Sequence, residues 1–361
     1  MDGSTHEIYM HRCLQQAKLG SGSVAPNPMV GAVLVYNDTI IGEGYHQKYG
    51  QAHAEVNCIR QAIENGNEGL LREATLYVSL EPCAHHGKTP PCADLIITHH
   101  IPKVVVGCRD PFVQVDGKGI EKLEKAGIEV VLGILENECK ELNKRFFTFH
   151  TKHRPYIVLK WAETADDKIA YGDHRRLFIS NAYTNRIVHK WRSEEMAIAV
   201  GTNTAFHDDP ELSTRLWPGS HPIRIVVDSD LRLPSSLKLF DGTIPTIVFN
   251  TKKHSIENVR AAFQGGVHYY QVAEDVSLVH QMLHALYKMN IQSVLIEGGA
   301  ALLQSFIDEG MWDEAKIITN EELIIGEGLP APVLNQYQLV HTDKFFSDIV
   351  HTYHFINHTT V

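Results

Sequence analysis

The sequence predicts two α/β domains, each built on a sheet that helices cover on both faces. The chain has 361 residues, and single domains rarely grow beyond about 250–300 residues before they split. Apolar residues make up 43% of it and charged residues 21%, as in ordinary globular proteins. Short apolar runs alternate with longer helical patterns, which is typical of mostly parallel sheets.

The first half opens with a helical pattern at 5–19 that a glycine ends. Two apolar runs follow at 29–36 and 39–43, and the turn-forming pair Asn37-Asp38 between them indicates a β-hairpin. From there strands and helices alternate, each bounded by glycine, proline or a polar turn. The predicted strands lie at 74–80, 103–108 and 128–132, and the predicted helices at 54–65, 92–100 and 117–126.

A short basic and polar segment at 150–155 ends in a proline, which favours extended backbone before it. We place a domain boundary there, which gives domains at 1–150 and 151–361. The second domain again alternates strands with helices. Its predicted strands lie at 156–161, 196–200, 223–228, 246–250 and 293–297, and its predicted helices at 181–193, 276–289 and 300–309.

The composition excludes several classes of protein. The formal net charge is -10 and no basic stripe is present, so we do not expect nucleic acid as a partner. No apolar stretch approaches the roughly 20 residues that a membrane span needs. The chain does not start with a basic segment followed by an apolar one, so we expect a cytoplasmic protein. Its six cysteines are too scattered for a disulfide framework, and metal binding is the better use for a pair of them.

Four residues of the first half form a pattern that predicts a catalytic zinc site. His53 and Glu55 stand at a helix start, Cys83 follows a strand, and Cys92 begins another helix. One imidazole and two thiolates would supply three ligands of tetrahedral zinc, with water in the open fourth position, as in catalytic sites. Zinc lowers the pKa of its bound water, and Glu55 is placed to carry a proton to a departing amine.

Each of these residues alone would more often be structural. A free cysteine is usually a small buried apolar residue, and an isolated histidine is seldom a ligand. The ordered set within one α/β unit is what indicates zinc. The remaining cysteines have no such context, and we interpret them as packing residues: Cys13, Cys58, Cys108 and Cys139.

The spacing of the cysteines leads to a particular family. Eight residues separate Cys83 from Cys92, more than in the commoner signature P-C-x-x-C. Four longer motifs surround these residues: A-P-N-P-M-V-G-A-V at 25–33, H-x-K-Y-G-x-A-H-A-E at 46–55, E-P-C-A-H-H-G-K-T-P-P-C at 81–92 and R-D-P at 109–111. They resemble the deaminase half of the bifunctional riboflavin-biosynthesis deaminase/reductase family.

Motifs of the second half resemble the reductase of the same family, so the resemblance covers nearly the whole chain. It implies a cytidine-deaminase-like three-layer α/β/α domain at the N-terminus and a dihydrofolate-reductase-like α/β domain at the C-terminus. The motifs are K-W-A-E-T-x-D-x-K-I-A at 160–170, V-G-T-N-T at 200–204, D-D-P-x-L at 208–212, I-R-I-V-V-D at 223–228 and I-E-G-G at 296–299.

The resemblance implies two reactions and two cofactors. A diaminopyrimidinone that carries a ribosylamino 5′-phosphate would lose a ring amine as ammonia at zinc, and NADPH would then reduce the ribosyl group to ribityl. Glu55 would be the catalytic residue of the first step, and His53, Cys83 and Cys92 the zinc ligands. The family pattern places contacts with the deaminase substrate at Asn27, His46, His85, Lys88 and Asp110.

In the second half, the pair Gly298-Gly299 closes a strand and opens a helix, which would let backbone N–H groups approach a cofactor phosphate. Such a pair alone is more often only a tight connection. By the resemblance, the substrate side would hold Lys160, Arg192, Arg215 and Glu297, with the guanidinium groups on the phosphate. The NADPH side would hold Thr204, Asp209, Ser229, Gly298, Gly299, Ala300 and Ala301.

Three positions depart from the family pattern. Phe112 stands where an asparagine is common, and Asp167 and Glu327 stand where glycines are common. An aspartate in place of a permissive glycine would shift a local turn.

Two further functions remain open at this point. The C-terminal domain could be a non-catalytic binding domain, or the chain could be a nucleic-acid-editing deaminase, which the acidic charge disfavours. A purely structural zinc module is weaker still, because such sites are closed by four protein ligands. The expected partners are a small phosphorylated pyrimidine and further copies of the chain, with neither nucleic acid nor membrane.

Overall fold

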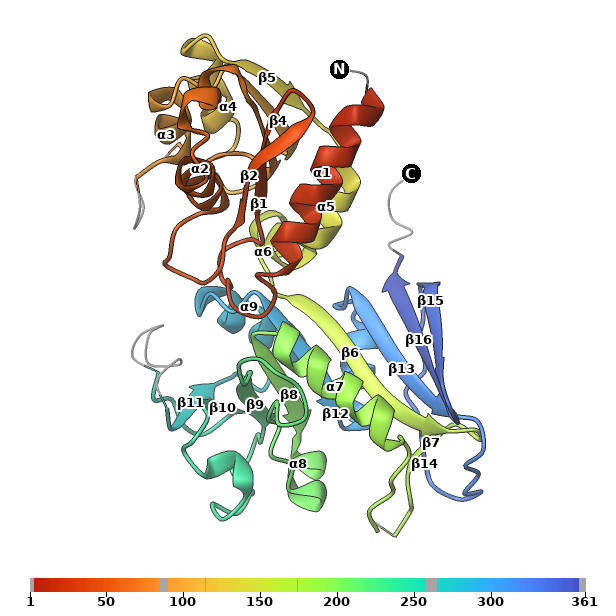
Figure 1. Ribbon diagram of the computed structural model, residues 1–361. Helices are drawn as coiled ribbons and strands as arrows, with labels where there is room; N and C mark the ends of the chain where they lie inside the picture. The colour runs from red at the N-terminus through yellow and green to blue at the C-terminus, as the bar shows by residue number, and fades with distance from the viewer. Residues whose placement is uncertain (1–2, 85–89, 114, 174, 257–264, 357–361) are drawn as a thin grey trace. The chain divides into compact units, whose positions relative to one another are not determined.

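The computed structural model describes residues 3–84, 90–113, 115–173, 175–256 and 265–356. The chain divides into two compact units, Met1–Lys152 and His153–Val361. We call them the N-terminal unit and the C-terminal unit (Figure 1). None of the helices in the described ranges combines the length and apolar character that a bilayer span requires.

The N-terminal unit contains a mixed sheet in the order β2-β1-β3-β4-β5. Strand β1 pairs antiparallel with both β2 and β3, whereas β3, β4 and β5 run parallel. The predicted hairpin at Asn37-Asp38 is confirmed, and the predicted parallel pairing holds for β3, β4 and β5, whereas β1 also pairs antiparallel with β3. The strands are β1 (Gly31–Tyr36), β2 (Thr39–Tyr45), β3 (Thr75–Leu80), β4 (Lys103–Cys108) and β5 (Glu129–Leu132).

Helices cover both faces of this sheet. Successive residues of β1 point to opposite faces: Ala32 and Leu34 belong to one apolar cluster, and Val33 and Val35 to the other. The first cluster packs under α2 (Ala54–Glu64), α3 (Cys92–Thr98) and α4 (Lys118–Lys125). The second packs under α1 (Gly3–Lys18) and α5 (Glu136–Leu142), which lie side by side in Figure 1, with α6 (Lys144–Lys152) following. The predicted three-layer α/β/α architecture is confirmed.

The C-terminal unit contains a larger sheet in the order β11-β10-β9-β8-β12-β6-β13-β16-β15. Its first seven strands are parallel, and β16 and β15 form an antiparallel hairpin at one edge. The strands are β6 (Tyr156–Thr164), β8 (Ala197–Gly201), β9 (Ile223–Val227), β10 (Thr246–Asn250), β11 (Val267–Gln271), β12 (Ser293–Gly298), β13 (Glu314–Asn320), β15 (Tyr337–Phe345) and β16 (Asp348–Phe355).

This sheet is also covered on both faces. One face packs under α9 (Leu278–Lys288) and α10 (Ala300–Asp308), and the other under α7 (Ala182–Glu194) and α8 (Thr202–Asp208). Figure 1 shows α7 running across its face of the sheet. A two-stranded ribbon joins β7 (Lys168–Ala170) to β14 (Leu329–Pro330), and short 3-10 turns stand at η1 (Glu68–Glu73) and η2 (Lys238–Phe240).

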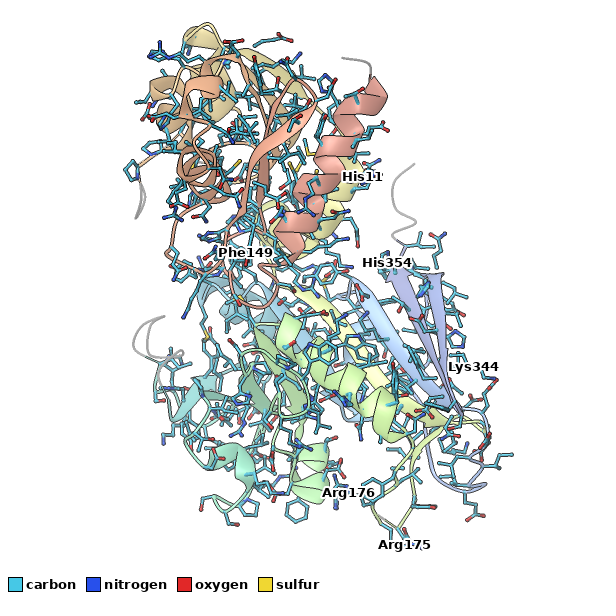
Figure 2. The ribbon with its side chains drawn as sticks, viewed as in Figure 1. His11, Phe149, Arg175, Arg176, Lys344 and His354 are labelled. Atoms are coloured by element: carbon cyan, nitrogen blue, oxygen red, sulfur yellow. The ribbon has the colours of Figure 1, made fainter. Side chains whose placement is uncertain are left out.

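Several elements lack a counterpart in the sequence analysis. Strands β11 and β15 stand at the two edges of the larger sheet, and β15 is mostly exposed. An edge strand with two solvated sides needs no continuous apolar run, so its pattern is weak. In Figure 2, Lys344 marks the turn end of the β15–β16 hairpin and His354 its open end.

Candidate active sites

The three predicted zinc ligands come together in the N-terminal unit. His53 caps the start of α2, Cys83 follows β3, and Cys92 opens α3. Each stands where a strand or helix ends, so the ends of three elements converge on one point. The ligand atoms of the three side chains all lie within 4.8 Å of one another.

Their separations fit a tetrahedral zinc ion. His53 Nδ1 lies 3.6 Å from Cys83 Sγ and 3.4 Å from Cys92 Sγ. Zn–N and Zn–S bonds of ordinary length at a tetrahedral angle would place such atoms about 3.5 Å apart. The hydrogen bond between the thiols lowers the pKa of Cys83 and raises that of Cys92. A bound cation favours the thiolate form of both cysteines.

Glu55 lies in the first turn of α2 and is only 3% exposed. Burial raises the pKa of its carboxyl group, while the nearby His53 acts in the opposite direction. The hydrogen bond with Cys83 raises the pKa of His53. The buried carboxyl group of Glu55 thus lies beside the predicted zinc ligands, and a carboxyl group with a raised pKa can both accept and release a proton.

Two of the predicted substrate contacts stand next to the zinc ligands. The His46 ring lies 5.4 Å from the His53 ring, edge to face, and is buried. Its Nδ1 lies 3.0 Å from the Ala52 carbonyl oxygen, and its Nε2 lies 3.1 Å from Nδ2 of Asn27. These bonds fix the orientation of both side chains. The predicted contacts His85 and Lys88 lie outside the described residues.

Asp110 is buried at the carboxyl end of β4. Its carboxylate accepts the backbone N–H of Phe112 at 2.8 Å. Burial, with smaller contributions from the charges of Glu81 and Cys83, raises the pKa of Asp110 to about 7. The position of Phe112 therefore contributes to the site through its backbone, whichever side chain it carries.

Sequence reasoning gave no role to Glu81, and the structure assigns it one. The buried Glu81 carboxylate accepts four backbone N–H groups, from Asp110, Gly117, Gly119 and Ile120, at 2.9 to 3.3 Å. It therefore holds the segment that carries Asp110 against the strand that carries Cys83. Its place inside the motif E-P-C could have pointed to Glu81. Its hydrogen-bond partners could not be predicted, because they lie 29 to 39 residues further along the chain.

In the C-terminal unit, a buried charged cluster forms between the carboxyl end of β12 and the middle of β6. Glu297 of β12 binds Arg192 of α7 through Nη2 at 2.6 Å and through Nε at 3.0 Å. Lys160 of β6 lies 3.5 Å from the same carboxylate. Three of the four residues predicted for the substrate side are therefore brought together.

The electrostatics of this cluster follow from its burial. Burial acts to raise the pKa of Glu297, but Arg192 and Lys160 outweigh it and the pKa is lowered. Burial lowers the pKa of Lys160, partly offset by Glu297. The cluster therefore holds a carboxylate between two cations at the end of the sheet, where ligands of parallel α/β folds bind.

The two predicted phosphate-binding arginines differ in their freedom. Arg192 donates to Glu297 and, through Nη1, to the carbonyl oxygen of Ser213 at 3.2 Å. The Arg215 side chain is half exposed, and its hydrogen-bond contacts with described residues are long, at 3.4 Å to Glu211 and 3.5 Å to Ser213. Arg215 is thus the guanidinium with more donors left for a ligand.

The residues around Gly298 fit a cofactor phosphate. A Cβ added at Gly298 would lie 2.9 Å from Cγ2 of Thr204, and Gly299 has a positive φ of 82°. Only glycine gives this close approach and this backbone angle without strain. The turn leads into α10, which includes Ala300 and Ala301 and whose first N–H groups have no partner inside the helix.

Two other residues predicted for the cofactor side have partners of their own. Asp209 accepts the backbone N–H of Lys238 at 2.8 Å, and its carboxylate lies 3.6 Å from the Lys238 ammonium group. Ser229 accepts the backbone N–H of Thr251 at 2.9 Å through its carbonyl oxygen. The first contact joins the end of α8 to η2, and the second joins the loops at the carboxyl ends of β9 and β10.

Asp167, one of the departures from the family pattern, lies in a turn. It has a φ of 57°, the left-handed conformation that a glycine would take, and aspartate tolerates it better than most residues. The preceding Asp166 accepts the backbone N–H groups of Ile325 and Gly326, which ties this turn to the segment that carries the exposed Glu327.

Comparisons with known proteins match a different family model to each of the two units. The family model described as the RibD C-terminal domain matches residues 155–350. The model described as the cytidine and deoxycytidylate deaminase zinc-binding region matches residues 3–108.

Full-length relatives are similar along both units. The riboflavin biosynthesis protein RibD of Aquifex aeolicus is 42% identical over 323 residues, covering 89% of this chain and 88% of the relative. RibD of Escherichia coli is 34% identical over 334 residues, covering 88% of each.

Solved structures show the same arrangement of elements. A diaminohydroxyphosphoribosylaminopyrimidine deaminase/5-amino-6-(5-phosphoribosylamino)uracil reductase from Thermotoga maritima has a TM-score of 0.87 at 36% identity, covering 98% of this chain and 99% of that one. RibD of Acinetobacter baumannii has a TM-score of 0.88 at 32% identity with the same coverage.

Proposed function

The chain belongs to the RibD family of bifunctional deaminase/reductases of riboflavin biosynthesis, and from that premise we propose which residues carry each of its two reactions. It is a zinc- and NADPH-dependent enzyme. The observation that carries the proposal is the convergence of His53, Cys83 and Cys92 beside the buried Glu55.

In the deaminase site, His53, Cys83 and Cys92 hold zinc. Zinc bound there supplies a Lewis acid and a water molecule of lowered pKa. Glu55 takes the proton from the attacking water and delivers it to the leaving ring amine, which departs as ammonia. The raised pKa of Glu55 suits a group that must both accept and return a proton.

His46, Asn27 and Asp110 orient the pyrimidine and its ribosyl group. The fixed pair of His46 and Asn27 offers a polar edge beside the metal ligands. Asp110, with a pKa of about 7, presents either a donor or an acceptor near neutral pH. We place Lys88 and His85 at the same substrate by the family pattern alone.

In the reductase site, NADPH supplies hydride to the opened ribosyl group of the deaminated product. Lys160 and Glu297 stand at the reacting carbon, and Arg215 binds the 5′-phosphate with Arg192 behind it. The turn at Gly298 and Gly299, with Ala300, Ala301 and Thr204, receives a cofactor phosphate. Asp209 and Ser229 border the cofactor from the neighbouring loops.

The test uses the full chain and the diaminopyrimidinone ribosylamino phosphate. Without NADPH we expect ammonia release and a mass gain of about one dalton, since an NH group is replaced by oxygen. With NADPH a further gain of about two daltons should follow, for the two added hydrogens. Ammonia release without any reduction would leave the C-terminal unit a binding domain, and no ammonia release would contradict the deaminase site.

We also propose a cytoplasmic homo-oligomer. All six cysteines, each within the described ranges, are free thiols, as in a reducing compartment. The edge strand β15 exposes Tyr337, Leu339 and Val340 by about half each, and such an edge invites pairing with another copy. Light scattering on wild type and Leu339→Lys tests this, and a monomeric wild type would contradict it.

A further inference from the structure

Two histidine rings hold neighbouring backbone groups of the segment 211–215 in the C-terminal unit. The N–H of Thr214 donates to Nδ1 of His221 at 3.0 Å, and the N–H of Arg215 donates to Nδ1 of His189 at 3.2 Å. Consecutive N–H groups outside regular structure are usually bonded to carbonyl groups or water. Here both N–H groups donate to imidazole nitrogens instead.

His189 belongs to the same helix face as Arg192, since the two stand three residues apart on α7. His189 is 2% exposed. Arg192 donates to the Ser213 carbonyl oxygen, so α7 binds the segment 211–215 at two points. Because Arg192 also binds Glu297, these bonds fix the segment relative to the charged cluster of the reductase site.

The histidines can act in this way only with an unprotonated Nδ1, because a protonated nitrogen donates and cannot accept. Burial, together with the cations Arg192 and Arg215, lowers the pKa of His189 to about 4, with Glu297 acting in the opposite direction. The ring is therefore neutral near neutral pH and carries its proton on Nε2. The proposed reductase chemistry makes no other use of it.

The bonds to the histidines leave the Arg215 side chain free while its backbone is fixed. The guanidinium group is half exposed and contacts Glu211 and Ser213 only at 3.4 and 3.5 Å. We propose that His189 and His221 are positioning residues of the reductase, which hold Thr214 and Arg215 by their backbone and so present the Arg215 guanidinium to the substrate 5′-phosphate. This rests on the proposed function of Arg215.

The test compares two substitutions at each histidine. Asparagine carries its carbonyl oxygen where histidine carries Nδ1, whereas glutamine carries its polar atoms near the place of Nε2. We expect His189→Gln to raise the KM of the deaminated 5′-phosphate substrate roughly threefold to tenfold, with kcat nearly unchanged. His189→Asn should return KM toward the wild-type value. At position 221 the KM should likewise be higher for His221→Gln than for His221→Asn.

The same substrate without its phosphate separates positioning from general damage. We expect the glutamine variants to leave its KM unchanged, and we expect His189→Gln to add nothing to KM in an Arg215→Ala background. Exposed His284→Gln on α9 is the matched control and should behave as wild type. If His189→Gln does not fold, the comparison of His221→Gln with His221→Asn tests the proposal instead, because His221 is exposed.

The failures are distinguishable. Equal KM values for the glutamine and asparagine variants, or a KM rise that is as large without the phosphate, overturn the positioning role while Arg215 keeps its function. If Arg215→Ala leaves the KM of the phosphorylated substrate unchanged, the proposed function of Arg215 fails, and the positioning role fails with it.

Discussion

Glu55 sits in the deaminase site with its carboxyl group buried and its pKa raised by that burial. It is two residues from His53, so the start of α2 brings the proposed metal ligand and the proposed proton carrier into one site. No second buried carboxyl group stands on this helix in the described residues: Glu64 is exposed. Glu55 and Glu64 therefore make a matched pair for substitution.

We expect Glu55→Gln to retain zinc and to lower the rate of ammonia release by about 10²- to 10⁴-fold, because an amide cannot accept and return a proton. Metal analysis together with an ammonia assay measures both. Glu64→Gln should match wild type in each. Ammonia release by Glu55→Gln at a near wild-type rate would remove Glu55 from the proton path.

At the scale of elements, the start of α4 is packed directly on the strand end that carries Cys83. A Cβ added at Gly119 would lie 1.9 Å from the Pro82 carbonyl oxygen and 3.2 Å from Oε1 of Glu81. Backbone atoms cannot move aside without moving the metal ligand next to them. The close approach brings to Glu81 three of its four donors, the N–H groups of Gly117, Gly119 and Ile120.

We expect Gly119→Ala to destabilise the N-terminal unit by roughly 3 kcal/mol and to lower its zinc content, since overpacking forces α4 away from Pro82. Denaturant unfolding and metal analysis measure these effects. Gly69→Ala is the control, because a Cβ there meets nothing within 4 Å. Equal stability of the two variants would contradict the prediction, because it would mean that the backbone near Pro82 accommodates the added Cβ without loss of stability.

The docking of α1 depends on pH through His6. Its ring is buried, and Nδ1 lies 2.9 Å from the Tyr77 hydroxyl group of β3. Burial, with a smaller contribution from Lys103, lowers the pKa of His6 below its ordinary value of 6.5. Below pH 6.5 the unfolded chain therefore binds more protons at this residue than the folded chain does, and folding is weakened.

We expect the unfolding free energy of the N-terminal unit to fall as pH drops through the range below 6.5, and to fall less in His6→Asn. The two chains share every other titratable group, so their difference isolates His6. Thiol labelling during denaturant unfolding at several pH values measures it. The control is His11→Asn. His11 is exposed and is labelled in Figure 2, and its replacement should leave the fall of the unfolding free energy with pH as in wild type. Parallel curves for wild type and His6→Asn would contradict the prediction.

At the scale of the whole molecule, the two units carry separate spectroscopic reporters. All six cysteines lie between Cys13 and Cys139, in the N-terminal unit. All four tryptophans lie between Trp161 and Trp312, in the C-terminal unit. Thiol reactivity therefore follows the first unit and tryptophan fluorescence the second, in one unmodified chain.

We expect removal of zinc with a chelator to stop ammonia release, to increase thiol reactivity, and to leave both the fluorescence midpoint and the NADPH-dependent reduction of deaminated substrate unchanged. The reason is that each unit has its own core and cofactor, and the metal ligands all belong to the first. Zinc added back should restore ammonia release. A fall in the reduction rate on chelation would show that the two activities are coupled.

The sequence by itself determined the α/β class and the order of most elements, and it predicted as zinc ligands three residues that the fold brings together. Apolar runs and turn residues act locally, so they predict strands, helices and turns without knowledge of which residues they contact in the fold. The zinc ligands, although far apart in the chain, stand in short motifs whose residue types have few other uses together. The predicted reductase cluster came from the resemblance, because no local pattern joins Lys160 to Glu297.

Only the tertiary structure decided the antiparallel pairing of β1 with β3, the four donors around Glu81 and the bonds of His189 and His221 to the segment 211–215. Each of these pairs residues through the path of the chain rather than through a repeating pattern. A buried carboxylate or imidazole takes whichever N–H the fold brings within about 3 Å, and the sequence does not name that partner. The positions of the reacting groups therefore depend on contacts that only the folded chain makes.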